Sequence, residues 1–247
     1  MSLKTTLNYS PNFNSKKRTP KQIKFIIFHY TGMKSESDAI SKLTEIQSEV
    51  SCHYLIKNNG EIVKMVPDLY IAWHAGKSSW KNYKSLNQNS IGIEITNPGH
   101  EFGYKKFTKK QIFSLLRLGR FLIKKYKISP RNFLGHSDIA VLRKKDPGEK
   151  FPWEYLSKNK IGIWHTLNKQ DLIKNRKLKI SKIEEGIFFN NLFKIGYSKN
   201  YLKDKGKHKY SIELAKNFQR RFRQVLVDGK IDQECLIISK DLIKRYN

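Results

Sequence analysis

Long apolar runs are absent from the 247-residue sequence, whose longest apolar pieces are as short as FIIF at residues 25–28. A membrane-spanning helix needs roughly 18 such residues, so we expect no membrane span. The first 22 residues also lack the apolar segment of about 7–15 residues that a secretory signal requires. We therefore expect a cytoplasmic address for the chain as written. A periplasmic or envelope address stays open if a leader is removed or export follows another route.

Cysteine is also scarce. The two cysteines, Cys52 and Cys235, lie far apart in the chain. This spacing provides no disulfide framework and no cysteine-based zinc motif. The redox compartment therefore stays undetermined.

Acidic residues are few, with 21 Asp and Glu against 49 Lys and Arg, which gives a formal net charge of +28. Such a charge attracts polyanions, among them nucleic acid, an anionic cell-wall polymer or a membrane surface. The basic residues are spread along the whole chain, and no signature of a nucleic-acid-binding module accompanies them. We therefore do not expect a nucleic-acid partner, although salt-sensitive binding to duplex would support one.

The apolar residues that are present predict strands. Residues 24–29 form a continuous apolar run that ends in His29, which is typical of a buried strand with one polar side chain at its end. Residues 53–66 contain two strand-like runs around Asn59-Gly60, the strongest short signal for a hairpin. These patterns indicate a sheet with at least one hairpin.

Residues 90–96 alternate strictly between apolar and other side chains. In a strand this alternation places Ile91, Ile93 and Ile95 on one face and Glu94 on the other. The acidic side chain then faces either solvent or a cleft, and alternation alone leaves both open. In a cleft beside a reactive water molecule, Glu94 would serve as general base and then as general acid.

Helices are predicted by capping and periodicity. Thr108 and Gln111 have the spacing of a capping box, and an apolar stripe over residues 112–123 predicts a long helix that ends near Lys127. Strands mixed with such helices predict an α/β (α+β) fold in which a mixed central sheet is flanked by helices.

The C-terminal third has a different pattern. Residues 151–168 resemble a loop, and a lysine-rich linker follows at 169–182. Helical periodicity then covers residues 183–195, 212–222 and 235–246, which predicts a small three-helix domain near the lower size limit for independent folding. We thus divide the chain into an N-terminal extension (1–22), a catalytic domain (23–168), a linker (169–182) and a helical domain (183–247).

The segment GHSDIAVLRKKDPG places His136, Lys144 and Asp146 close together before a turn. Zinc hydrolases commonly hold their ion with three His or carboxylate ligands and leave the fourth position to water. His29, His136 and Asp146 could supply such a set. Taken alone, each residue is more often explained by ordinary strand-end or turn chemistry, because Asp before Pro-Gly favours a turn and lysine is abundant.

Five ordered segments together carry more information: FIIFHYT, VSCHYLI, AWHAGKSSW, NSIGIEITNPG and GHSDIAVLRKKDPGEKFPW. Over residues 20–165 the chain resembles the amidase-2 family of zinc N-acetylmuramoyl-L-alanine amidases, in its AmpD/AmiD branch. The resemblance implies a mixed sheet with flanking helices and a surface groove that holds zinc. It also implies hydrolysis of the amide bond between muramic acid, or its 1,6-anhydro form, and L-alanine of peptidoglycan stem peptides.

The resemblance also assigns roles to matching residues. It implies one Zn²⁺ ion per chain, held by His29, His136 and Asp146, with Glu94 as acid and base and Lys144 as the cation that stabilises the oxyanion. Cys52 stands where distant phage relatives carry a catalytic tyrosine, which favours the branch that uses the glutamate.

We expect peptidoglycan or muropeptides as the partner, and the sequence leaves the oligomeric state and the preferred form of substrate open. Trp73-His74-Ala75 resembles the substrate-side loop of the family, where His74 either contacts sugar or peptide or is a packed loop histidine. The residues that we expect to bind substrate are His53, Tyr54, Trp73, His74, Ala75 and Asn97.

Two further alternatives concern function. Residues 215–232 resemble the three-helix peptidoglycan-binding domain, through Phe218-Gln219 and Asp228-Gly229, although Cys235 stands near a usual threonine. The alternative is a helical bundle that only packs on the catalytic domain. For the whole protein, the alternative is a non-catalytic peptidoglycan-recognition protein, a class that usually lacks a metal ligand.

Overall fold

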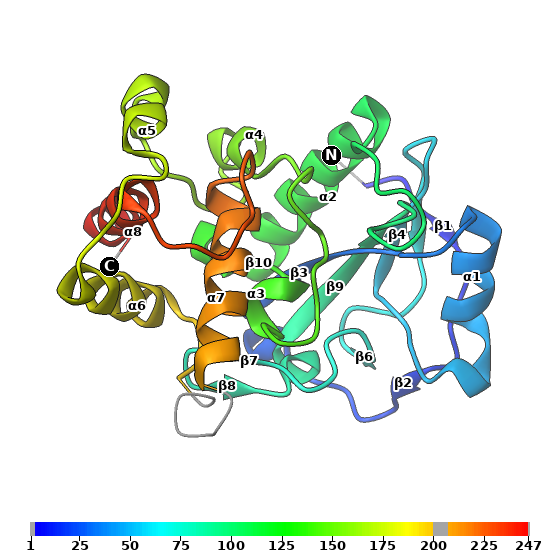
Figure 1. Cartoon of the computed structure of the whole chain (residues 1–247). Helices are drawn as coiled ribbons and strands as arrows, with labels where there is room; N and C mark the ends of the chain where they lie inside the picture. Colours follow the sequence, from blue (N-terminus) through cyan, green and yellow to red (C-terminus); the bar gives the residue numbers. More distant parts are fainter. Residues whose placement is uncertain (1–2, 200–206, 247) are drawn as a thin grey trace.

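A computed structural model describes residues 3–199 and 207–246 of the chain (Figure 1). Its centre is a six-stranded mixed sheet in which neighbouring strands run parallel, except for the antiparallel pair β4 and β5. The strands, in spatial order, are β1 (Thr6–Leu7), β5 (Ile62–Lys64), β4 (Tyr54–Ile56), β9 (Ser90–Ile95), β3 (Phe25–Tyr30) and β10 (Phe133–Gly135). The predicted mixed sheet is thereby confirmed.

Two small antiparallel ribbons join β2 (Phe13–Asn14) to β6 (Ile71–Ala72) and β7 (Ser79–Trp80) to β8 (Tyr83–Lys84). The helices are α1 (Glu36–Thr44), α2 (Lys109–Tyr126), α3 (His136–Ile139), α4 (Trp153–Lys158), α5 (Lys169–Asn175), α6 (Lys182–Ile195), α7 (Lys207–Phe222) and α8 (Gln233–Tyr246). Among the residues described, none of these helices is long and apolar enough to cross a membrane.

The elements with strong local patterns form where the sequence predicts them. β3, the β4–β5 hairpin and β9 match the three predicted strand regions. The predicted capping box opens α2: the Thr108 side chain accepts a hydrogen bond from the Gln111 amide, and the Gln111 side chain accepts one from the Thr108 amide. Lys127 ends this helix in the left-handed conformation.

The four short helices α1, α3, α4 and α5 were not predicted, and two of them form where a loop and a linker were expected. Residues 151–168, expected to be a loop, contain α4, and the expected linker 169–182 contains α5. Both helices depend on tertiary contacts. In α4, Trp153 is buried against the aromatic rings of Phe28 and Phe151. In α5, Asn168 caps the first turn and Leu172 is buried.

The two faces of the sheet have different partners because side chains alternate along each strand. Ile26 and Phe28 of β3 face α2, and they share a core cluster with Leu118 and Leu122 of that helix. Phe25, Ile27 and His29 therefore lie on the opposite face. Phe25 and Ile27 belong to a second cluster that includes residues of the C-terminal helices.

The C-terminal helices pack directly on this second face. Phe188 of α6, Phe218 of α7 and Leu236 of α8 share one hydrophobic cluster with Phe25 of β3 and Leu134 of β10. Figure 1 shows α5, α6 and α8 grouped at the end of the molecule opposite α1, with α7 beside α3. Residues 182–195 and 207–246 thus share one hydrophobic core with the central sheet.

Candidate metal centre and active site

Three predicted ligands meet at one edge of the sheet. His29 lies near the end of β3, and His136 directly follows β10, which pairs in parallel with β3. Because parallel strands end at the same edge, the two imidazoles become neighbours. Asp146 reaches them from the following loop, where its carbonyl oxygen accepts a hydrogen bond from the Ser137 amide at 2.9 Å.

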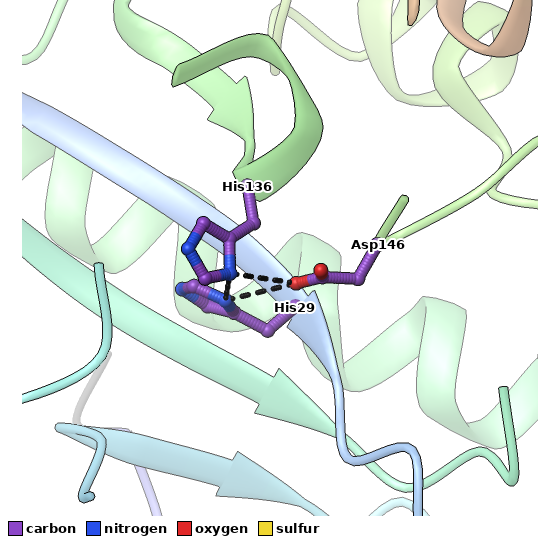
Figure 2. A group of neighbouring side chains, drawn as sticks. All are labelled: His29, His136 and Asp146. Carbon is purple, nitrogen blue, oxygen red and sulfur yellow. Dashed lines mark hydrogen bonds and ion pairs between the residues drawn. The ribbon is translucent and has the colours of Figure 1, made fainter. Parts of the chain in front are cut away.

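Figure 2 shows the Asp146 carboxylate facing both imidazole rings. The Nδ1 atoms of His29 and His136 lie 3.0 Å apart, and Asp146 Oδ2 lies 3.0 Å from the first and 3.1 Å from the second. An ion held tetrahedrally with bonds of about 2.0–2.2 Å separates its ligand atoms by about 3.4 Å. The observed triangle is within a few tenths of an ångström of that value, so these residues fit a metal ion.

The protonation states also suit a metal site. Burial, followed by the nearby His136, lowers the pKa of His29 to about 4. Burial alone would raise the pKa of Asp146, but His136 and His29 hold it well below its usual value. At neutral pH the cluster therefore contains a neutral His29 imidazole and a carboxylate, which are the forms that bind metal.

The second ring nitrogen of each histidine has its own partner. His136 Nε2 donates a hydrogen bond to the Ala75 carbonyl at 3.2 Å, and Arg143 donates to the same oxygen at 2.9 Å. His29 Nε2 lies 3.1 Å from His74 Nδ1. Such partners orient metal-binding histidines.

Glu94 lies beside the metal centre. It is the register partner of His29 on the neighbouring strand and lines the same cavity, which settles the choice between solvent and cleft in favour of the cleft. Its Oε2 atom is buried and has no hydrogen-bond partner among the described residues. Burial, and then the negative charge of Asp146, raise the pKa of Glu94 well above its usual value, while Lys144 opposes the shift.

Lys144 lines the cavity from the loop that carries Asp146 and is half-buried. It shares the cavity wall with His29 and Glu94, and its positive charge acts to lower the pKa of both groups. Within residues 3–199 and 207–246, no hydrogen bond of this ammonium group is found. It is therefore available to a negatively charged group in the cavity.

The cavity has a volume of about 380 Å³. Besides the three clustered residues, Glu94 and Lys144, its wall includes three basic residues, Lys42, Arg143 and Lys145, and the acidic residue Glu101. Tyr30, Trp73 and His100 supply aromatic surface. This combination suits a polar ligand that carries carboxylates and apolar ring faces.

Of the residues expected to bind substrate, Trp73 and His74 line the cavity. Tyr54 does not, contrary to expectation. It lies on the α2 face of the sheet, where it is buried and its hydroxyl donates a hydrogen bond to Asp68 at 2.6 Å. Strand alternation explains the difference, because Leu55, the next residue, is the one whose register partner is Glu94.

His53, Ala75 and Asn97 are also absent from the cavity wall. His53 accepts a hydrogen bond from the Gly92 amide and lies 2.9 Å from an Arg18 nitrogen, so it is part of the buried support of β9. Ala75 contributes its carbonyl to His136. Asn97 shapes the loop after β9 by donating to the Lys105 carbonyl.

Sequence reasoning missed several residues of the cavity wall. Tyr30 and His100 face the cavity and are joined by a hydrogen bond of 2.9 Å. Strand alternation would place Tyr30 on the face opposite His29, and His100 lies in a loop with no periodic pattern, so no local signal indicated either residue. Cys52 is buried against Met65 and is not part of the cavity wall.

Comparisons with known proteins agree with this geometry. A sequence profile of the N-acetylmuramoyl-L-alanine amidase family matches residues 19–149. The amidase AmiD of Escherichia coli is 32% identical over 237 residues, which cover 91% of this chain and 84% of AmiD. The 1,6-anhydro-N-acetylmuramyl-L-alanine amidase AmpD of Haemophilus influenzae is 34% identical over 60% of this chain and 88% of AmpD.

Solved structures give the same result. The complex of E. coli AmiD with anhydro-N-acetylmuramic acid-L-Ala-D-gamma-Glu-L-Lys superposes with a TM-score of 0.78 at 32% identity, covering 91% of this chain and 90% of that one. AmpDh3 of Pseudomonas aeruginosa also reaches 0.78, at 30% identity, covering 94% of this chain and 97% of that one. The chain is thus an enzyme that belongs to the N-acetylmuramoyl-L-alanine amidase family.

Proposed function

We propose that this amidase holds one Zn²⁺ ion between His29, His136 and Asp146. With it, the enzyme cleaves the amide bond between muramic acid, or its 1,6-anhydro form, and L-alanine of peptidoglycan stem peptides. The reaction would belong to cell-wall turnover or recycling. The observation that supports this most is that three converging ligand atoms and the side chain of Glu94, whose Oε2 atom has no partner among the described residues, share one cavity.

Zinc is the metal that best fits this donor set. Two imidazoles and one carboxylate are common ligands of catalytic zinc sites, whereas Mg²⁺ and Ca²⁺ prefer oxygen ligands. When bound, zinc would polarise the amide carbonyl and lower the pKa of a water molecule. Residues of the chain would transfer the proton and stabilise the charge that develops on the carbonyl oxygen.

Glu94 is placed to move the proton. Glu94 lines the same cavity as His29 and Asp146, and its Oε2 atom has no hydrogen-bond partner among the described residues, so it would accept a proton from the attacking water. The carboxyl group would then donate that proton to the leaving nitrogen of L-alanine. A raised pKa favours this role, because a base works best when its pKa approaches the working pH.

Lys144 would stabilise the charge that develops on the carbonyl oxygen. Attack on the amide carbon leaves negative charge on that oxygen, and the Lys144 ammonium lies in the cavity with no hydrogen bond within the described residues. A fixed positive charge in a partly closed site stabilises such a transition state strongly. Lys144 would thus act at the carbonyl oxygen, and Glu94 at the attacking water and the leaving nitrogen.

The proposed substrate class rests on the ligands bound to related structures and on the positive charge of the cavity wall. AmiD and AmpDh3 have been solved with anhydro-muramyl peptides, ligands whose peptide part carries carboxylates. In this chain Lys42, Arg143 and Lys145 line the cavity, and they would attract those carboxylates. The expected cytoplasmic address remains a proposal, and it would suit soluble recycled fragments.

The test is hydrolysis of a soluble anhydro-muramyl tripeptide by the zinc-loaded protein, followed by mass spectrometry of the products. Free tripeptide and anhydro-muramic acid are expected from the wild type, and strongly reduced amounts from Glu94→Gln. Binding of the ligand without any release of peptide would overturn the proposal and favour a recognition protein. Parallel digestion of intact sacculi would show which form of substrate is preferred.

A further inference from the structure

The two histidines of the metal centre are oriented differently. His136 donates to a backbone carbonyl, whereas His29 Nε2 meets the imidazole of His74 at 3.1 Å. An imidazole nitrogen either donates or accepts, so this contact alone does not say which nitrogen of His29 carries hydrogen. The position of this hydrogen follows from the contacts that His74 makes with its other ring nitrogen.

The chain continues from His74 Nε2 to the Ser90 hydroxyl oxygen at 3.2 Å, and from that hydroxyl to the Leu86 carbonyl at 2.6 Å. A carbonyl only accepts, so the single hydroxyl hydrogen of Ser90 is committed to Leu86. The Ser90 oxygen must then accept a hydrogen from His74 Nε2. In a neutral imidazole this leaves His74 Nδ1 without hydrogen.

His29 must therefore donate from Nε2 to His74 Nδ1. Its own Nδ1 then carries a free lone pair, and this is the atom that lies 3.0 Å from both His136 Nδ1 and Asp146 Oδ2. The direction of every hydrogen bond is thus fixed by a backbone carbonyl at the far end.

The fold provides a closely fitted place for the His74 ring. Gly92 of β9 lies directly behind it, and a Cβ atom at this position would come within 2.4 Å of His74 Cγ. On the other side, the amides of His74 and Ala75 both donate to the Asn87 side-chain oxygen, at 3.1 and 2.7 Å. Any side chain larger than that of glycine at position 92 would displace the ring.

We propose that His74 is a positioning residue, which holds His29 in the Nε2–H form and so presents His29 Nδ1 to the metal. Its function is not to bind substrate, although part of its edge reaches the cavity. The proposal rests on the metal role of His29 in the proposed function. It does not depend on the identity of the substrate.

The first test is the protonation state of His29 in the wild-type protein. Long-range proton–nitrogen NMR spectra distinguish a ring with hydrogen on Nε2 from one with hydrogen on Nδ1. We expect Nε2–H for both His29 and His74 in the zinc-loaded protein, where His29 Nδ1 would bind the metal. Hydrogen on Nδ1 of His74 in that form would overturn the proposal, because His74 could then accept no hydrogen from His29, and this result requires no variant and no catalytic assay.

The second test compares zinc affinities, measured by competition with a chelator. His74→Phe fills the space but removes the acceptor, and loss of such an outer partner typically lowers metal affinity about 10–100-fold. His74→Asn places an amide oxygen where Nδ1 was, so its zinc affinity is expected to stay within a few-fold of the wild type. His208→Phe, a change of an exposed residue on α7, is the matched control and should leave affinity unchanged.

The outcomes separate this proposal from the proposed function. If His74→Phe binds zinc as tightly as the wild type but has a raised KM, His74 contacts substrate and the positioning role is wrong. If the wild type binds zinc with the expected tautomers but cleaves no muropeptide, the proposed function fails while the positioning role stands. A wild type that binds no zinc contradicts both. Circular dichroism and thermal unfolding of each metal-free variant identify any loss of folding.

Discussion

Arg221 of α7 forms a buried ion pair with Asp138 of α3, across 83 positions of sequence. The same Asp138 carboxylate accepts hydrogen bonds from the Gly135 amide at 2.8 Å and from the Tyr197 hydroxyl at 2.7 Å. Asp138 follows His136 by two residues, so these bonds fix the turn that presents this predicted ligand. The C-terminal helices therefore support the candidate metal centre as well as extending the core.

The first prediction concerns this ion pair. Arg221→Met should lower the free energy of unfolding by about 3–5 kcal/mol, because it leaves the Asp138 carboxylate buried without its charged partner. The guanidinium also lies 4.3 Å from the centre of the Trp153 ring, a contact that the variant would lose. Urea unfolding measures the change.

A matched control is Lys216→Ala, which removes a partly exposed ion pair with Glu213 on the same helix. Such surface pairs contribute about 0–1 kcal/mol, so little change is expected. Equal stabilities of the Arg221→Met variant and the wild type would show that the C-terminal helices do not stabilise the catalytic part through Asp138.

The second prediction separates proton transfer from metal binding. Glu94→Gln should reduce kcat by about 10²–10⁴, because the amide cannot take up the proton that the carboxylate accepts. Glu94 is not one of the three clustered ligands, so zinc affinity should stay close to that of the wild type. Steady-state kinetics and chelator competition measure the two quantities. A variant that keeps its full kcat would exclude Glu94 as the base.

The third prediction concerns the cavity cation. Lys144→Met should lower kcat by about 10²–10³ through loss of charge stabilisation in the transition state. Lys109→Met, on the exposed start of α2, removes the same charge far from the cavity and should leave kcat unchanged. Similar losses in both variants would indicate that the overall positive charge matters and that Lys144 has no specific role.

The fourth prediction is a dependence of stability on pH. Burial alone would raise the pKa of Asp68, but hydrogen bonds from Lys125, Tyr54 and Tyr126 outweigh it and lower the pKa to about 2. The unfolded chain binds a proton near 3.8, the ordinary value for this group. The carboxylate therefore contributes about 2 kcal/mol of stability above that pH, and this contribution is lost progressively as the pH falls toward 2.

Asp68→Asn removes the titration, so the difference in unfolding free energy between wild type and variant should shrink between pH 5 and pH 2. Chemical denaturation at several pH values measures it. A difference that stays constant over this range would show that the pKa of Asp68 is not lowered by folding.

The sequence predicted best those elements whose signals are local. The Asn59-Gly60 turn, the alternation of residues 90–96 and the capping box at Thr108 each specify their element from a few neighbouring residues, and the structure contains all three. The metal cluster was also predicted, because the resemblance joins His29 to a distant His136 and Asp146. Strand alternation also correctly predicted that Glu94 lies on the face of β9 opposite its isoleucine neighbours.

What the sequence did not predict depends on contacts between distant segments. The helix α4 is stabilised by the packing of Trp153 against Phe28 and Phe151, which no local pattern reveals. Tyr54 was expected near substrate, yet its register on β4 turns it toward α2. The orientation of His29 by His74 requires a hydrogen-bond chain through Ser90, and only the folded arrangement brings these groups together.

The most direct measurement is the zinc content of the protein and its link to hydrolysis. Native mass spectrometry should find one zinc ion per chain, and treatment with a chelator should remove it and abolish release of peptide from a muramoyl-peptide. One equivalent of zinc should restore activity to the wild type but not to His136→Ala. Full hydrolysis by chelated, zinc-free protein would contradict the proposed metal mechanism.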